Sequence, residues 1–181
     1  MTTRMKTFAG LAGALLAAGS LMAGDGGKDR SRFAVRADLI GFQEVPALST
    51  TAKGSFEAWV DTESNAIYWK LKYDGLEGTV TQAHVHFGQM GVNGGISFFL
   101  CSNLGNGPAG TQACPEGPAV LEGTVTPELV LGPGAAPPAA PGQGIEPGAF
   151  SEIAAAIKAG VSYANVHTTK WPGGEIRGQL R

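Results

Sequence analysis

Hydrophobic and polar residues alternate in short runs along most of this chain, which is the pattern of β-strands with one buried face. Lys70 and Lys72, for example, alternate with Trp69, Leu71 and Tyr73. Glycine, proline, asparagine and aspartate separate the runs and indicate turns. We therefore predict eight strands, over residues 33–40, 54–60, 66–73, 80–87, 96–101, 119–125, 162–168 and 175–180.

Two stretches break this alternation. Residues 132–148 contain ten glycines and prolines in seventeen positions, so we expect a surface loop there. Residues 150–160 are rich in alanine, have Phe150, Ile153 and Ile157 at helical spacing and end in glycine, which predicts one short helix. Eight short strands with a single helix predict an all-β domain, an antiparallel sandwich or barrel, of which we favour a Greek-key-like β-sandwich.

The N-terminal segment differs from the rest in composition. Arg4 and Lys6 precede an uncharged run over residues 7–24 that is rich in alanine, leucine and glycine, the arrangement of a secretory signal peptide cleaved near Ala23. A membrane anchor is the alternative, but glycines dilute the run below the roughly 20 apolar residues of a membrane span. We expect a secreted or periplasmic protein with no stable membrane span after cleavage. The predicted divisions are a signal over residues 1–23, a flexible leader over residues 24–32 and one domain over residues 33–181.

Charge and cysteine content fit this compartment. Without residues 1–23, 11 of the 13 Lys and Arg residues remain against 15 Asp and Glu, a net charge of −4. Mild acidity without basic clusters excludes nucleic acid as an expected partner, and leaves an unidentified protein or other extracellular partner. Cys101 and Cys114 bracket a turn-rich loop, which predicts a disulfide in an oxidising compartment. A redox pair or thiolate metal site is the alternative, but the spacing fits neither.

All three histidines lie in two of the predicted strands. Alternation places His84 and His86 on one face of their strand, and His167 can approach from a neighbouring strand. Three imidazoles with a vacant fourth position suit Cu(II), and less well Zn(II), so the three histidines are candidate metal ligands. A shared ion requires the His167 ring to lie within about 6 Å of another of these rings. The alternative is a structural role, with hydrogen bonds to Asn165, Glu175 or Gln82.

Catalytic sequence motifs are absent. The chain has no Gly-x-Ser-x-Gly elbow, no Gly-x-x-x-x-Gly-Lys loop and no His-Glu-x-x-His pattern, and we assign no catalytic residue. We interpret Glu44 and Glu175 as solvated or turn-bracing acids. Met90 is a softer potential ligand close to His86 in sequence, and Trp171 is the tryptophan expected to be exposed near the histidines.

Three segments resemble the CHRD family, named for domains first described in the animal protein chordin and common in exported bacterial proteins. They are residues 39–46 (LIGFQEVP), residues 83–88 (AHVHFG) and residues 165–180, which include NVHT and PGGEIRGQL. The order and spacing of the segments match over residues 33–181. The resemblance implies a sandwich-like all-β domain with a binding or structural role and a poorly defined function in bacteria.

The His84-Val85-His86 segment is also similar to the copper-binding His-Val-His of copper–zinc superoxide dismutases, in which a later histidine, here His167, binds copper as well. This similarity implies a copper oxidoreductase as the alternative function. Those enzymes need a fourth, bridging histidine, which this chain lacks. They also guide superoxide with an arginine, where the best alignment puts Glu175, with Arg177 nearby, and a negative charge there would repel the anion. We therefore expect a non-enzymatic module that binds copper.

Overall fold

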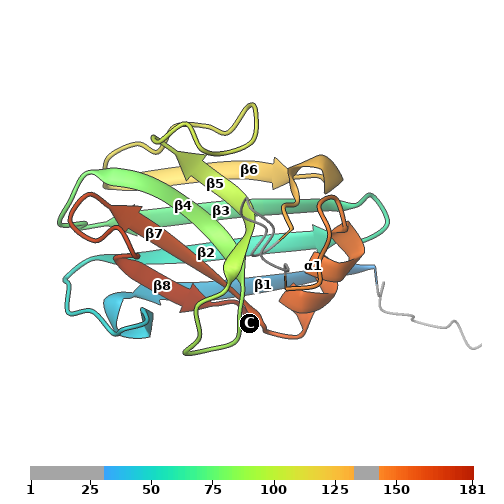
Figure 1. Ribbon diagram of the computed structural model, residues 1–181, viewed down its shortest axis with the longest axis horizontal. Helices are drawn as coiled ribbons and strands as arrows, with labels where there is room; N and C mark the ends of the chain where they lie inside the picture. The colour runs from blue at the N-terminus through green and yellow to red at the C-terminus, as the bar shows by residue number, and fades with distance from the viewer. Residues whose placement is uncertain (1–30, 133–142) are drawn as a thin grey trace, which may run out of the picture.

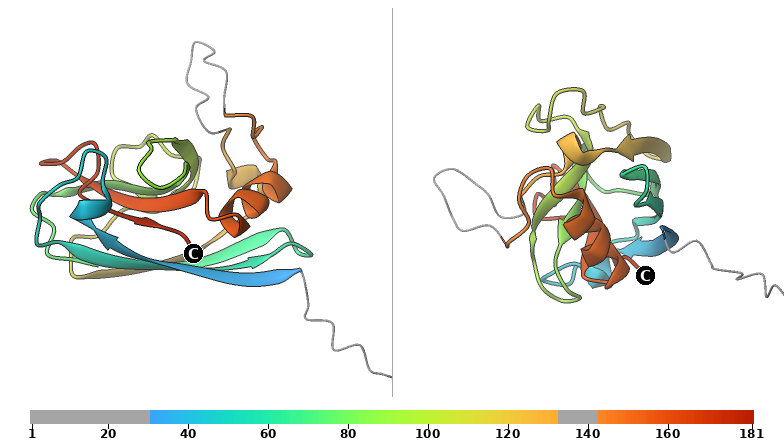
Figure 2. Two further views of the ribbon diagram at one scale, coloured as in Figure 1. Left: turned by 90° about the horizontal axis from the view of Figure 1, so that it is seen from below. Right: turned by 90° about the vertical axis from the view of Figure 1, so that its right-hand side faces the viewer.

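The computed structural model describes residues 31–132 and 143–181. Its eight strands form one antiparallel ladder in the order β5-β4-β7-β8-β1-β2-β3-β6. The ladder folds over into two facing layers, with β5, β4, β7 and β8 in one and β1, β2, β3 and β6 in the other (Figure 1 and Figure 2). The strands are β1 Arg32–Ile40, β2 Lys53–Asp61, β3 Ala66–Asp74, β4 Val80–Phe87, β5 Gly95–Ser102, β6 Ala119–Val125, β7 Ser162–Thr168 and β8 Ile176–Gln179. The predicted all-β, sandwich-like fold is confirmed.

The two layers meet at a narrow junction. Strand β8 pairs with β7 over four residues, but it meets β1 at a single register position, Ile40 opposite Arg177. Strands β5 and β6 lie at the two ends of the ladder order. The sheet is therefore an open sandwich that folds at the β8–β1 junction.

The core fills the space between the layers. Alternation along β1 and β3 turns apolar side chains inward and leaves polar side chains such as Lys72 exposed. The helix α1 (Phe150–Lys158) lies at one end of the sandwich (Figure 1), where it buries Phe150, Ile153 and Ile157. Gly160 follows it with φ +72, a conformation that favours glycine after a helix. Fully buried members of the core are Leu39, Phe56, Ile67, Leu71, Val85, Phe98, Ile153, Val166, Ile176 and Leu180.

Strand β7 is buried on both faces, because every one of its seven residues is buried. Ala164 and Val166 belong to the core between the layers. Successive side chains of a strand point to opposite faces, so Tyr163, Asn165 and His167 face away from that core. Connecting loops cover this outer face, and it is here that the histidines lie.

Several sequence predictions can be compared directly. The disulfide between Cys101 and Cys114 is present, with an S–S distance of 2.04 Å. The short 3₁₀ helices η1 (Gly41–Gln43) and η2 (Pro127–Leu129) were not predicted, because three residues are too few to produce a periodic pattern. The predicted signal, the predicted leader up to residue 30 and residues 133–142 of the predicted loop lie outside the described residues. Within the described part, no helix has the length and apolar character needed to cross a membrane.

Candidate metal centre

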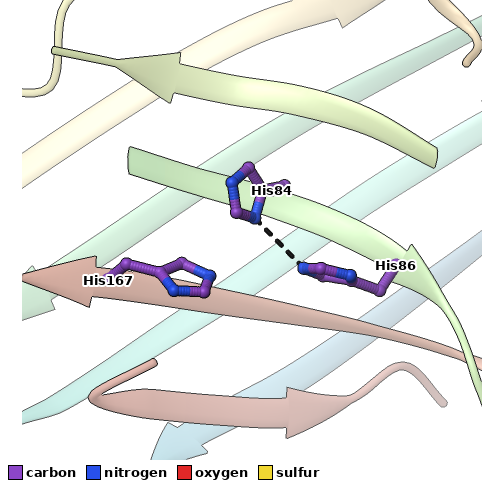
Figure 3. A group of neighbouring side chains, drawn as sticks. All are labelled: His84, His86 and His167. Atoms are coloured by element: carbon purple, nitrogen blue, oxygen red, sulfur yellow. Dashed lines mark hydrogen bonds between the residues drawn. The ribbon is translucent and has the colours of Figure 1, made fainter. Parts of the chain in front are cut away.

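Strands β4 and β7 bring the three histidines together on the outer face of their layer (Figure 3). Val85 belongs to the core between the layers, so His84 and His86 on either side of it face outward. In the antiparallel β4–β7 register, His84 lies opposite Asn165 and His167 lies opposite Gln82. The predicted sharing of one face by the three histidines is therefore present.

The three rings are close enough to share an ion. The His84 ring centroid lies 4.6 Å from that of His167 and 5.0 Å from that of His86, and the His86 and His167 centroids are 6.4 Å apart. One nitrogen from each ring falls within 4.8 Å of the others. Nitrogens bound at about 2.0–2.1 Å to one ion are at most about 4.2 Å apart. A ring movement of less than about 1 Å would thus suffice for joint coordination.

Backbone carbonyl groups orient two of the rings. His86 Nδ1 lies 2.9 Å from the Gly94 carbonyl oxygen, and His167 Nδ1 lies 2.9 Å from the Pro172 carbonyl oxygen. Since a carbonyl only accepts, each Nδ1 donates its proton and each Nε2 carries a lone pair. A histidine that binds a metal through one nitrogen commonly donates its other N–H to such a group. His86 Nε2 accepts a hydrogen bond from His84 Nδ1 at 3.1 Å, and the ring nitrogens without a partner are Nε2 of His84 and Nε2 of His167.

Burial keeps the three imidazoles neutral. It lowers the pKa of His84 to about 2, with further lowering by His167 and His86. It also lowers the pKa of His86 to about 4 and lowers that of His167. Neutral imidazole is the metal-binding form, so protons do not compete for these nitrogens near neutral pH.

Buried polar atoms without hydrogen-bond partners gather at this site. Seven such side-chain atoms occur among the described residues, and two of them are His84 Nε2 and His167 Nε2. Asn165 Oδ1 and Glu44 Oε1 are two more, and the Asn165 side chain interacts with both His84 and Glu44. Unpaired buried polar atoms are rare in folded proteins, and a bound ion or water would satisfy such a group.

The loop over residues 88–94 lies beside His86 and is held in place by hydrogen bonds. The Arg177 guanidinium donates to the Val92 carbonyl oxygen (2.9 Å), the Gln89 carbonyl oxygen (3.3 Å) and Asn93 Oδ1 (3.1 Å). The Tyr163 hydroxyl accepts a hydrogen bond from the Gly94 N–H. Through Gly94, these contacts fix the carbonyl group that orients His86.

One family model matches the part of the chain that forms the sandwich. The CHRD domain model matches residues 35–180, nearly the whole chain. The chain belongs to the CHRD domain family. Neither the curated proteins nor the solved structures include a match to it.

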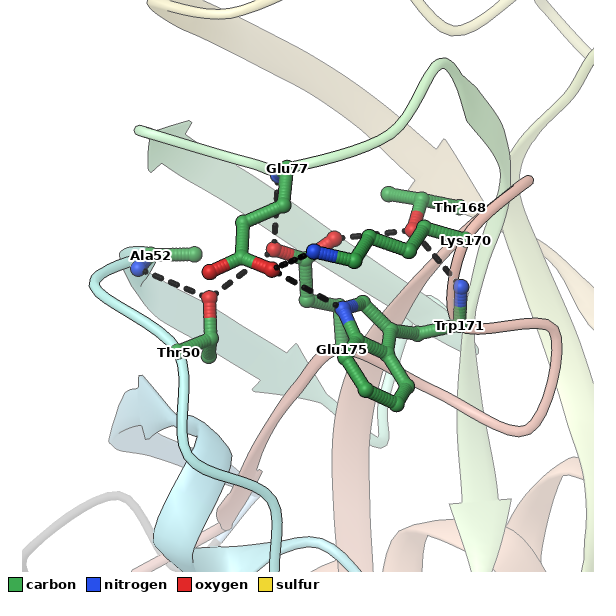
Figure 4. Close-up of polar contacts among 7 residues, drawn as sticks. All are labelled: Thr50, Ala52, Glu77, Thr168, Lys170, Trp171 and Glu175. Carbon is green, nitrogen blue, oxygen red and sulfur yellow. Dashed lines mark hydrogen bonds and ion pairs between the residues drawn. The ribbon is translucent and has the colours of Figure 1, made fainter.

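In this CHRD domain, Arg177 and not Glu175 lies on the histidine face, which corrects the sequence alignment. Glu175 is fully buried and accepts hydrogen bonds from Thr50 Oγ1 (3.0 Å), the Glu77 N–H (2.8 Å) and Thr168 Oγ1 (2.8 Å) (Figure 4). Thr168 follows His167 in β7 and so points to the opposite face. Gly174 turns the chain here with φ +126, which regular alternation does not anticipate.

Three other residues of the CHRD domain also differ from expectation. Glu44 is buried, not solvated, and burial raises its pKa to about 7. Met90 is exposed, unlike the buried histidines, and its sulfur lies 3.7 Å from an Arg181 nitrogen. Trp171 is half-buried and donates from Nε1 to Glu77 Oε2 (Figure 4).

Two further residues of this face, Asn165 and Tyr163, are not among the predicted site residues. Asn165 lies two residues before His167, which places both side chains on one face of the strand. The ring of Tyr163 stacks on that of His86 with centroids 4.7 Å apart. The same alternation that selected the histidines identifies both residues.

Proposed function

We propose that this CHRD domain is an exported, non-enzymatic module that binds one copper ion through His84, His86 and His167. The observation that supports it most is the convergence of three neutral imidazoles, two of them oriented by carbonyl groups. This donor set and its outer contacts are those of protein metal sites. Imidazole ligands suit both copper and zinc, and Cu(II) binds such sites more tightly in the usual affinity order.

Export is supported by two features of the chain. Residues 1–23 have the composition of a secretory signal. The Cys101–Cys114 disulfide is of the kind that persists in an oxidising compartment. A copper-binding module outside the cytoplasm would meet copper in its oxidised form, for which nitrogen ligands are well suited.

The surroundings of the histidines favour binding over turnover. The three side chains are at most 8 % exposed, with Gly94 against His86, Phe99 against His84 and Pro172 against His167. Arg177 is 1 % exposed, with its guanidinium engaged by loop carbonyl groups. An arginine so enclosed does not attract superoxide from solution as an exposed guiding charge would. A dismutase-type copper oxidoreductase remains the second candidate, supported by the His-Val-His similarity and by Arg177 on the histidine face.

The decisive experiment is a metal titration of the purified protein with Cu(II) and Zn(II), followed by calorimetry and by EPR. We expect one copper per chain and a nitrogen-rich Cu(II) spectrum, both lost in the triple variant His84→Ala, His86→Ala, His167→Ala. Met90→Leu is the matched control, because it removes an exposed potential ligand outside the cluster, and it should bind copper like the wild type. Binding that is weaker than millimolar, or unchanged in the triple variant, would refute the proposal.

A superoxide assay separates the two candidate functions. The copper-loaded protein should show no more turnover than an equal concentration of the triple variant supplied with the same copper. Turnover that depends on the three histidines would favour the dismutase-type enzyme instead.

A further inference from the structure

Asn165 lies at the centre of the histidine cluster. It pairs with His84 across the β4–β7 ladder and with Arg177 across the β7–β8 ladder. It shares the outer face of β7 with His167, two residues along the strand. Only 3 % of Asn165 is exposed. Its carboxamide nevertheless has four hydrogen-bonding positions to satisfy.

The Asn165 carboxamide has Glu44 and two of the histidines as neighbours. It lies close enough to the Glu44 carboxyl to influence its pKa, beside the larger effects of burial and of Arg177. It also lies close enough to influence the pKa of His84 and of His86, for which burial is the largest cause. The carboxamide therefore lies between the Glu44 carboxyl and these two rings.

The imidazoles beside Asn165 have no free proton to give its Oδ1. The Nδ1 proton of His86 is committed to the Gly94 carbonyl oxygen, and the Nδ1 proton of His84 is committed to His86 Nε2 at 3.1 Å. Oδ1 is accordingly one of the buried atoms without a donor. A cation among the three rings would pair with the oxygen lone pairs and the ring nitrogens at once.

We propose that Asn165 Oδ1 is the fourth ligand of the metal that His84, His86 and His167 bind, which makes the site a three-nitrogen, one-oxygen centre. This inference rests on the proposed function. Glu44 is not the fourth ligand, because the group of mutually close donor atoms in the described residues comprises the three histidines without a carboxylate. The Tyr163 oxygen is already engaged by the Gly94 N–H.

An amide oxygen changes what the site prefers to bind. Oxygen is a harder donor than imidazole nitrogen or thioether sulfur, and soft ligands select Cu(I). A fourth oxygen ligand thus favours Cu(II) over Cu(I). Because the oxygen is neutral, the bound ion retains its full positive charge inside the protein, close to the Glu44 carboxyl group.

The test compares Asn165→Leu, which removes the oxygen at similar size, with Asn165→Asp, which keeps an oxygen. Gln82→Leu is the matched control, since Gln82 lies opposite His167 on the same face and hydrogen-bonds Asn106. Cu(II) and Cu(I) affinities are measured by competition with chelators, and Cu(II) EPR spectra are recorded. Asn165→Leu should weaken Cu(II) binding by about 10–100-fold, alter the copper hyperfine splitting and change Cu(I) affinity by less than about threefold. Asn165→Asp and Gln82→Leu should retain Cu(II) affinity.

The outcomes are distinguishable from failure of the proposed function. If the wild type binds no copper through its histidines, both proposals fail. If binding depends on the histidines but Asn165→Leu keeps the wild-type affinity or EPR spectrum, only the fourth ligand is refuted. Should Asn165→Leu not fold, a crystal structure of the copper-loaded wild type decides: Oδ1 at about 2.2 Å from the ion supports the proposal, and Oδ1 beyond about 3.5 Å refutes it.

Discussion

The Arg177 guanidinium lies 3.4 Å from the centroid of the Tyr163 ring. The Tyr163 ring also stacks on the His86 imidazole, with only 2° between the two planes. Arg177 donates to the 88–94 loop as well, so it links this loop to a side chain that packs against the candidate metal site. Cation–π contacts and charged hydrogen bonds of this kind are worth more when buried.

Arg177→Gln should destabilise the domain by about 2–4 kcal/mol, because it leaves buried carbonyl groups without a donor and removes the contact with Tyr163. Chemical unfolding measures the loss, and limited proteolysis should cut the variant within residues 88–94. Arg36→Gln, which changes an exposed arginine of β1, should alter stability by less than about 0.5 kcal/mol. Equal stability of the two variants would contradict the role assigned to Arg177.

Stability of the metal-free protein should fall as the pH is lowered from 7 to 5. Burial lowers the pKa of His84 to about 2 and that of His86 to about 4, whereas in the unfolded chain both return to about 6.5. The unfolded state therefore binds protons over this range that the folded state does not, and acid favours unfolding.

The triple histidine-to-alanine variant isolates this effect from the carboxyl groups. The wild type should lose stability relative to the variant by up to about 1.4 kcal/mol per pH unit for each histidine. The measurement is urea unfolding of both proteins, without metal, at pH 7, 6 and 5. A stability difference that is the same at all three values would mean that the histidines do not have lowered pKa values.

Glu175→Gln should lower the free energy of unfolding by about 2–3 kcal/mol. The buried carboxylate accepts from the Glu77 N–H and from two threonine hydroxyls, and an amide NH₂ at one of these positions would face a donor. Glu77→Gln is the comparison, since its ion pair with Lys170 is partly exposed and such pairs contribute little to stability. Thermal unfolding followed by circular dichroism compares the stability of the two variants. A larger loss of stability in Glu77→Gln than in Glu175→Gln would contradict the prediction.

Removal of the disulfide should cost stability without affecting the candidate metal site. Cys101 and Cys114 are 13 positions apart in sequence, and a closed loop of this size contributes about 3 kcal/mol. The variant Cys101→Ala, Cys114→Ala should unfold at a lower temperature than the wild type but bind Cu(II) like it. A reducing agent should lower the melting temperature of the wild type and leave that of the variant unchanged.

Period-two alternation was enough to predict most of the fold. It located every strand, because an antiparallel sandwich presents one apolar face per strand, as Leu71 and Lys72 illustrate in β3. It also placed His84 and His86 together. It could not indicate that their face would be covered, since burial of His86 depends on the Gly94 loop and not on the strand.

The errors of prediction lie where alternation stops. Glu175 precedes β8 and follows Gly174, whose positive φ changes the direction of the next side chain, so counting residues placed the wrong charge beside the histidines. Glu44 follows a 3₁₀ turn and is buried by contacts from distant segments. One of these is Gly174, which lies so close that a Cβ on it would be 2.3 Å from the Glu44 carboxylate. Contacts between loops far apart in the sequence leave no local pattern to detect.

Because β7 is buried on both faces, neighbouring residues in it belong to different parts of the molecule. Ala164 and Val166 pack in the core between the layers, whereas Asn165 and His167 lie with the other histidines beneath the loops. The two groups share a backbone and lie on opposite sides of the sheet. Substitutions on the outer face can therefore change the histidine cluster while the sandwich beneath keeps its packing.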